Sequence, residues 1–181
     1  MKRQRNSNGE HGSAGATKLA LRRLPLSSMR PTQMTVGLRY ARVKALISGR
    51  NPLQLEDFMQ RHPVRVVLGP GDACYIVDHH HWAVAWQLMG VTHVPSHVVA
   101  ERQQMQEEAF WRLMGKRRWV HPFSPTGSRE PLEALPQSLD QLKDDPYQSL
   151  AARRRVQENE WRGVVVRLGR LLPRARPVRR R

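Results

Sequence analysis

The spacing of apolar residues divides the chain into extended and helical segments from Leu24 onward. Leu24 to Ser28 is typical of a short extended segment, and Arg30-Pro31 ends it because a residue before proline is disfavoured in the helical region. Apolar positions then recur at i, i+4, i+7 and i+11, namely at Val36, Tyr40, Val43 and Ile47. This spacing predicts a helix that Thr35 caps and Gly49 ends.

A second helix and a β-hairpin are predicted next. Asn51 and Pro52 have the residue types of a helix start, and this helix should run to about Arg61. Residues 64–68 and 73–77 are apolar runs that flank the turn sequence GPGD, a pattern that predicts two antiparallel strands.

The next segments predict a helix between two strands of one sheet. Ala83, Trp86 and Met89 give residues 79–90 an apolar helical face, and Gly90 is a C-terminal stop. Residues 94–99 form a further strand, residues 101–118 an amphipathic helix, and Ser138 with Gln141 caps a short helix toward residue 144. We expect an α+β fold in which a small mixed sheet is packed with helices, with 73–77 and 94–99 in that sheet under the 79–90 helix.

Length and composition predict one domain, residues 23–150, between two basic ends. Residues 1–22 are expected to be a disordered tail, because Gly, Ser, Asn and charged residues provide too little apolar surface for folding. The sequence contains neither a membrane-spanning apolar run nor a secretory signal pattern, so we expect a cytoplasmic protein that does not bind membranes. Cys74, the one cysteine, lies in an apolar strand pattern and is expected in the core.

The formal charge of +16 suggests nucleic-acid binding until its distribution is considered. Residues 1–30 carry +6 and residues 151–181 carry +9, which leaves +1 for residues 31–150. An interaction with nucleic acid would therefore depend on the basic tails rather than on the folded part.

The strongest candidate site is the run from Asp78 to His81, where a strand passes directly into a helix. The first amides of a helix and the positive end of its dipole attract anions. His79, His80 and His81 add imidazoles that can donate, accept or transfer protons. Asp78 can cap the helix, hold a histidine tautomer or contact Mg²⁺.

Structural explanations exist for the same residues. Asp is a common helix cap, and three consecutive histidines point about 100° apart around a helix, so they cannot all face one pocket. A zinc site from His79, His81 and a distant third ligand lacks the i, i+4 spacing that places two ligands on one face. His121 could approach a site or lie exposed in a loop, and Asp144-Asp145 could bind a cation or cap a turn. Four tryptophans could either stack on a nucleic-acid base or pack in the core, namely Trp82, Trp86, Trp111 and Trp119.

Three blocks of the chain, in order, resemble the ParB-like nuclease family of the ParB and sulfiredoxin superfamily. The blocks are LSSMRPTQMTVG, PVRVVLGPGDACYIVDHHHWAVAWQLMGVTHVPSHVV and LPQSLDQLKDDPYQSLA. In relatives the strand-to-helix junction is G-E-R-R, G-C-H-R or, in free serine kinases, D-G-H-H-R, where it meets nucleotide phosphates. The resemblance implies that Asp78, His80 and His81 match the kinase aspartate and histidines. His79 replaces the glycine, and Trp82 replaces an arginine that would bind phosphate.

The last segment departs from that family. After DDPYQSLAA the sequence becomes rich in Arg, Gly, Pro and Val. Our hypothesis is that residues 151–181 are a shifted-frame or otherwise non-native translation of a GC-rich gene, in which case their charge says nothing about partners.

These observations lead to three functional hypotheses, and they leave open whether the protein is an enzyme. In the first, the Asp78 to His81 junction binds a phosphate-containing small molecule, a nucleotide foremost, for phosphotransfer or phosphate hydrolysis. Asp78 is then a base or a contact of Mg²⁺ bound with the nucleotide, and His80 or His81 donates to phosphate, more strongly as pH falls from 8 to 6. In the second, Asp78 holds the metal of a ParB-like nuclease. In the third, the protein is a non-catalytic DNA-binding or partner-binding module.

Overall fold

The computed structural model describes residues 21–149, and the expectations for both tails therefore fall almost entirely outside the described residues. The first described element, β1, begins at Leu21, two residues before the predicted start of the domain. Among residues 21–149, no helix is long and apolar enough to cross a bilayer.

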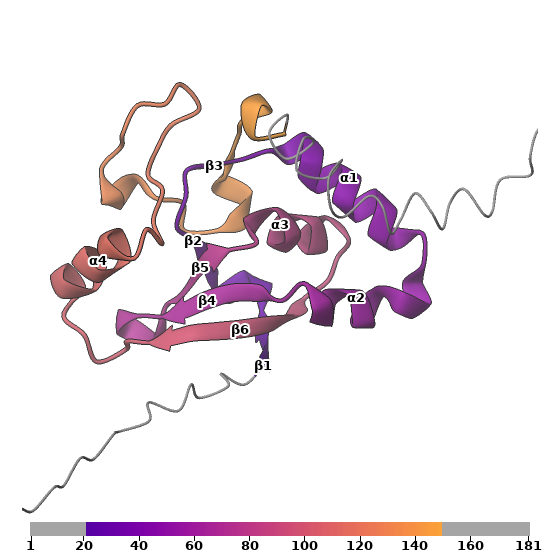
Figure 1. The fold of residues 1–181 in the computed structure, drawn as a ribbon, viewed down its shortest axis with the longest axis horizontal. Helices are drawn as coiled ribbons and strands as arrows, with labels where there is room; N and C mark the ends of the chain where they lie inside the picture. The colour runs from indigo at the N-terminus through magenta and orange to yellow at the C-terminus, as the bar shows by residue number, and fades with distance from the viewer. Residues whose placement is uncertain (1–20, 150–181) are drawn as a thin grey trace, which may run out of the picture.

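A mixed five-stranded sheet forms the centre of the domain, with the strand order β1-β6-β4-β5-β2 (Figure 1). Its strands are β1 (Leu21–Pro25), β2 (Met29–Pro31), β4 (Val64–Leu68), β5 (Cys74–Asp78) and β6 (His93–Glu101). β4 pairs antiparallel with β5 and parallel with β6, so the predicted hairpin is confirmed. The two strands expected in one sheet are both present in it, with β4 between them.

A second, two-stranded sheet joins segments that are far apart in the sequence. β3 (Thr35–Val36) pairs in parallel with β7 (Lys143–Asp144). The amides of Lys143 and Asp145 donate to the carbonyls of Met34 and Val36, at 3.1 and 3.0 Å. This pairing brings the end of the described chain beside the segment that leads into the first helix.

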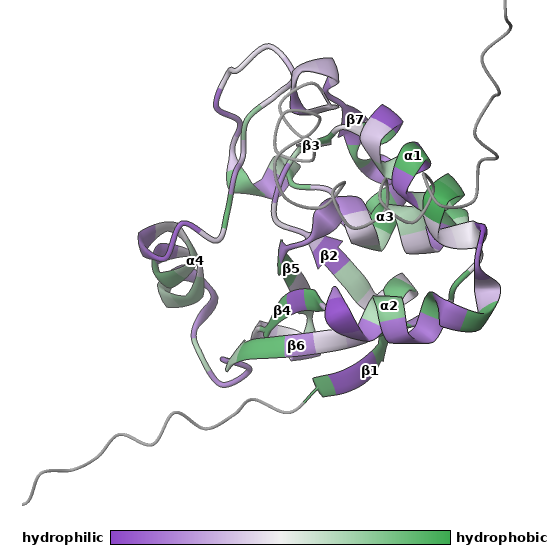
Figure 2. Cartoon of the chain, turned by 45° about the vertical axis from the view of Figure 1, so that its right-hand side comes forward, coloured by the Kyte–Doolittle hydropathy of each residue, from purple (hydrophilic) through white to green (hydrophobic). Residues whose placement is uncertain are grey.

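Helices cover both faces of the five-stranded sheet. Successive strand residues point to opposite sides, and both sides carry apolar residues that need to be buried. The helices are α1 (Leu38–Gly49), α2 (Leu55–Arg61), α3 (His80–Leu88) and α4 (Glu107–Lys116). Ile76 and Val66 face a core with α3, whereas Tyr75 and Val67 face a second core with α4. Figure 2 shows α3 rich in apolar residues between the sheet and α1, and α1 itself mixed in polarity. The α+β prediction is therefore confirmed.

The buried face predicted for the first helix is wrong, and so is its predicted start. Thr35 lies in β3 rather than at a helix cap, and α1 begins at Leu38 after Gly37. Val43 is exposed, whereas Ala41 and Lys44 are buried against α3. A pattern that counts lysine as polar cannot find this face, because Lys44 buries its stem and places its ammonium over aromatic rings.

Three other predictions are also adjusted by the structure. Arg30-Pro31 does not end the first extended segment but belongs to β2. α4 begins at Glu107, because β6 continues to Glu101 and a turn follows. The short helix after Ser138 is one 3-10 turn, Leu139–Gln141, before β7. Packing of α3 through Ala83, Trp86 and Met89 and burial of Cys74 are both confirmed.

Candidate functional site

The junction between β5 and α3 is a sharp turn at one residue. β5 ends at Asp78, and α3 begins at His80. His79 between them adopts φ 68° and ψ 27°, a left-handed conformation that is uncommon outside glycine. The Asp78 carboxylate accepts a 2.7 Å hydrogen bond from the amide of His79, so it stabilises this turn instead of capping the helix one turn further on.

The three imidazoles diverge toward three different backbone segments. His79 Nδ1–H donates to the carbonyl of Pro63 at 2.7 Å, which fixes its tautomer. His80 Nε2 accepts from the amide of Thr32, and His81 Nε2 accepts from the amide of Gly37, both at 3.3 Å. The expectation that the histidines do not face one pocket is met. Among residues 21–149, no three His, Cys, Asp or Glu side chains are grouped to hold a metal ion, so the zinc alternative has no donor set in that range.

Burial sets the charge of two of these histidines. It lowers the pKa of His80 to about 3, with the neighbouring His81 as the next cause. Burial also lowers the pKa of His81 to about 4, with the Lys44 ammonium as the next cause. Both side chains are therefore neutral at pH 7. The expectation that His80 or His81 would donate to phosphate by protonating between pH 8 and 6 does not agree with this environment, because desolvation disfavours imidazolium.

The exposed groups at the junction are Asp78 and Arg65. An Arg65 guanidinium nitrogen lies 3.5 Å from Asp78 Oδ2, and both side chains are about half exposed. Arg65 enters from β4, where it lies opposite Asp78 in the sheet. His79 is partly exposed beside them. The junction thus presents a carboxylate and a guanidinium to a ligand, with the partly exposed imidazole of His79 beside them.

Lys44, a buried lysine close to His81, was not predicted from the sequence as a residue of the site. The Lys44 ammonium lies 3.4 Å from the centroid of the Trp82 ring and 4.6 Å from that of Tyr40. Trp82 stacks in turn on Trp86 at 4.9 Å, and both tryptophans belong to the core. The core interpretation of these two residues is confirmed, and Lys44 adds a positive charge close to His81.

The two adjacent aspartates near the end of the described chain both act at helix starts. Asp144 Oδ1 accepts from the amide of Leu38, the first residue of α1, at 2.8 Å. Asp145 Oδ1 accepts from the amides of Tyr147 and Gln148, at 2.9 and 3.2 Å. Of the two interpretations left open for this pair, the structure favours capping.

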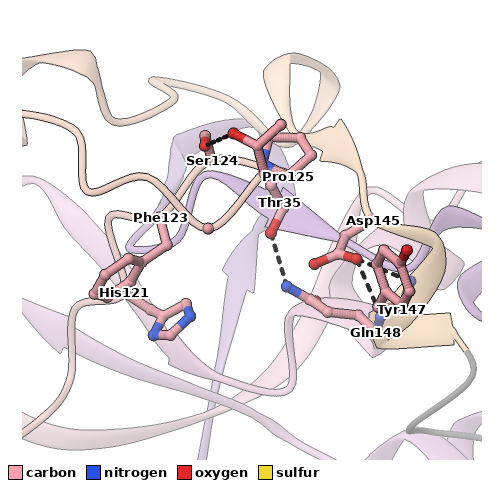
Figure 3. Close-up of a pocket in the computed structure, with 10 residues that line it drawn as sticks. Thr35, His121, Phe123, Ser124, Pro125, Asp145, Tyr147 and Gln148 are labelled. Atoms are coloured by element: carbon pink, nitrogen blue, oxygen red, sulfur yellow. Dashed lines mark hydrogen bonds between the residues drawn. The ribbon is translucent and has the colours of Figure 1, made fainter.

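A pocket of about 480 Å³ lies beyond the β3–β7 sheet (Figure 3). Three segments line it: Thr35 of β3, the loop 121–127, and the turn 145–148. His121 lies in its wall, so the expectation that this histidine could approach a site is relevant here rather than at Asp78. Sequence patterns could not indicate this pocket, because its walls are brought together by the pairing of two-residue strands and by the contact of His121 with the segment before β3.

Comparison with known proteins places this geometry in a family. Residues 22–162 match the family described as "Putative ParB-like nuclease". Protein Atu1540 from Agrobacterium tumefaciens, known from a crystal structure, is 33% identical, with a TM-score of 0.66 over 77% of this chain and 69% of that one. No curated protein matches the sequence significantly. The fold is ParB/sulfiredoxin-like, and the chain belongs to the ParB-like nuclease family.

Proposed function

We propose that the protein binds a phosphate-containing ligand, a nucleotide foremost, at the junction from Asp78 to His81. The observation that carries this proposal is the position of Arg65, whose guanidinium lies 3.5 Å from Asp78 beside the start of α3. The amides of His80 and His81 occupy the first helical positions, where no intrahelical acceptor exists. Such amides, the helix dipole and a guanidinium are all suited to phosphate oxygens.

In this proposal the three histidines contribute in different ways. His80 and His81 offer their backbone amides to phosphate, while their neutral side chains hold Thr32 and Gly37 in place. His79 has its Nδ1–H engaged by Pro63, so its Nε2 is the imidazole atom suited to accept or deliver a proton. His79 is thus better placed than His80 or His81 for acid–base chemistry.

Asp78 fits the part of a Mg²⁺ contact. Proteins commonly hold Mg²⁺ through one or two carboxylates together with the phosphates of the substrate. Asp78 is exposed, and its Oδ1 accepts from the His79 amide. Its Oδ2 faces Arg65 and is the oxygen that would contact a metal ion bound with the ligand. A bound Mg²⁺ would neutralise charge on the phosphates during phosphotransfer or hydrolysis. Asp78 would hold that ion or, in its absence, accept a proton.

Phosphodiester hydrolysis is the second candidate, and the description of the matched family favours it. It would use the same Asp78 and His79, with a nucleic-acid strand as the phosphate ligand. Because no three His, Cys, Asp or Glu side chains are grouped to hold a metal ion among residues 21–149, a metal at Asp78 would depend strongly on ligand phosphates for its remaining contacts.

Titration calorimetry with ADP, ATP and inorganic phosphate, with and without Mg²⁺, tests the first candidate. Arg65→Ala should weaken nucleotide binding about tenfold, because a charge-assisted phosphate contact is lost. Asp78→Asn should keep the turn and remove the effect of Mg²⁺. Arg22→Ala, which removes an exposed arginine of β1 paired with Glu101, is the matched control and should change little.

A nuclease assay separates the two candidates. Release of fragments from a labelled oligonucleotide that depends on Mg²⁺ and on Asp78 would establish hydrolysis. Nucleotide binding without strand cleavage would leave the first candidate alone. If the full-length protein neither binds a nucleotide nor cleaves the oligonucleotide, the junction is not a phosphate site.

A further inference from the structure

The pocket between β3, the loop 121–127 and the turn 145–148 is separate from the phosphate junction in its chemistry. Its lining contains one formally charged side chain, Asp145, and neither lysine nor arginine. A phosphate group would find neither an ammonium nor a guanidinium group there. Its volume of about 480 Å³ is in the range of small-molecule sites.

Backbone hydrogen bonds build the walls of this pocket in advance. The amide of Asp145 donates to the carbonyl of Val36 at 3.0 Å, and the amide of His121 donates to that of Thr32 at 2.7 Å. The loop that follows closes on itself, since the amide of Ser124 donates to the carbonyl of Ser128 at 2.8 Å. The three segments are therefore held in position independently of a ligand.

Two side chains of the pocket, Asp145 and Gln148, have oxygen atoms that can accept hydrogen bonds from a ligand. Asp145 Oδ1 is occupied by the amides of the following turn, and Figure 3 shows the second carboxylate oxygen turned away from them. Gln148 Nε2 donates to Thr35 Oγ1 at 2.7 Å. That bond uses the donor end of the amide and leaves its carbonyl oxygen as an acceptor.

Aromatic rings complete the lining. Phe123 lies against His121, with ring centroids 4.7 Å apart, and Tyr147 is 76% exposed at the opposite wall. An exposed tyrosine beside a carboxylate presents a π-face to a ligand, and π-faces attract cations. A guanidinium is planar, rich in donors and weakly hydrated, so it matches rings and carboxylate oxygens together.

We propose that this pocket is a binding site for a small organic cation, of the guanidinium class, held by Asp145 and Gln148 against the ring of Tyr147. The site is independent of the junction at Asp78, and the two bind ligands of opposite charge. A protein with both could respond to a cationic small molecule while it binds a phosphate ligand.

Titration calorimetry on the full-length protein with n-butylguanidinium tests this proposal. The neutral analogue n-butylurea has nearly the same shape and should bind at least about tenfold more weakly, and butyrate should not bind. Asp145→Asn retains a capping oxygen and removes the charge, so it should weaken guanidinium binding about tenfold without loss of folding. Asp144→Asn is the matched control, because Asp144 caps α1 and does not line the pocket.

The aromatic contact has its own pair of variants. Tyr147→Ala should weaken binding about two- to fivefold, while Tyr147→Phe should retain it, since the ring rather than the hydroxyl faces the cation. Equal affinities for the guanidinium and the urea, or equal losses in Asp144→Asn and Asp145→Asn, would overturn the proposal. Binding of an arginine-containing peptide without binding of n-butylguanidinium would overturn it too, in favour of a protein partner.

Discussion

The amide of Thr32 donates a hydrogen bond to Nε2 of His80, 3.3 Å away, and joins the end of β2 to the first residue of α3. Both residues are buried, and Thr32 Oγ1 also donates to the carbonyl of Ile76 at 2.6 Å. A buried amide needs an acceptor, and an imidazolium cannot be one. His80 is therefore required in its neutral form, as a structural acceptor inside the motif that the sequence marks as a site.

Replacement of His80 tests this role. His80→Leu leaves the Thr32 amide buried without an acceptor and should reduce the free energy of unfolding by about 1 to 3 kcal/mol. His80→Gln can place a carbonyl oxygen near the position of Nε2 and should cost less. Urea denaturation at pH 7.5 measures both. If the two variants lose the same stability, the hydrogen bond to Thr32 does not matter for the fold.

Acid should destabilise the protein through His80 and His81. Their pKa values in the fold are about 3 and about 4, below the value of about 6.5 for an unfolded histidine. Between these values the unfolded chain binds protons that the folded chain does not, so stability is fully present above pH 6.5 and falls as pH decreases. Each histidine should cost about 2 kcal/mol between pH 6.5 and 5.

Denaturation curves at pH 7.5, 6.5, 5.5 and 5 measure this slope. The double variant His80→Gln with His81→Gln is the comparison, because it retains side-chain acceptors without titratable groups. Its stability should depend much less on pH over this range. A slope equal to that of the wild type would assign the acid sensitivity to other residues.

The Lys44 ammonium should act directly on the titration of His81. It is the second cause, after burial, of the low pKa of that histidine. Lys44→Met removes the charge and should raise the pKa of His81, although burial should still hold it below 6.5. Titration of the imidazole resonances by NMR measures the change. Lys116→Met, at the exposed end of α4, should leave His81 unaffected.

Gly69 is required by the close approach of two rings. A Cβ at this position would lie 2.7 Å from Tyr75 Cε2 and 2.8 Å from Phe110 Cζ. Both rings are buried in the core beneath α4, so Gly69→Ala should destabilise by about 1 to 3 kcal/mol. Gly115→Ala meets no atom within 4 Å in α4 and should instead stabilise by about 0.5 to 1 kcal/mol. Thermal unfolding of both variants would show opposite shifts.

Local patterns predicted the elements that are themselves locally determined. β4 covers the predicted residues 64–68, because a β-branched run ends at a turn sequence. α3 has its predicted face, with Ala83 and Trp86 fully buried. The face of α1 was missed because Lys44 is buried by an interaction with Trp82, a residue of another helix.

The candidate site could also be predicted only in part. The sequence proposes the run from Asp78 to His81 as a candidate, and helical geometry alone implies that its imidazoles diverge. Which groups they reach depends on Pro63, Thr32 and Gly37, and these are brought together only by the fold. Burial then shifts the histidine pKa values in a direction that the unperturbed values do not suggest.

The pH dependence of anion binding at the junction should not arise from His80 or His81. Because His80 and His81 remain neutral above pH 5, their side chains should not strengthen binding between pH 8 and 6. Sulfate is a suitable probe, since its own charge is constant over this range. The double variant His80→Gln with His81→Gln should show the same pH profile of sulfate affinity as the wild type, and Arg65→Ala should lower the affinity at every pH.

His79→Gln completes this comparison. His79 is partly exposed beside Asp78 and Arg65, and its Nε2 remains after Nδ1–H is engaged by Pro63. If the His79 side chain contacts the anion, His79→Gln should lower the sulfate affinity, whereas the double variant should retain the affinity of the wild type. Calorimetric titrations at pH 8, 7 and 6 measure both. Loss of the pH dependence in the double variant alone would mean that His80 or His81 becomes accessible and protonated when the anion binds, against the environment that the fold gives them.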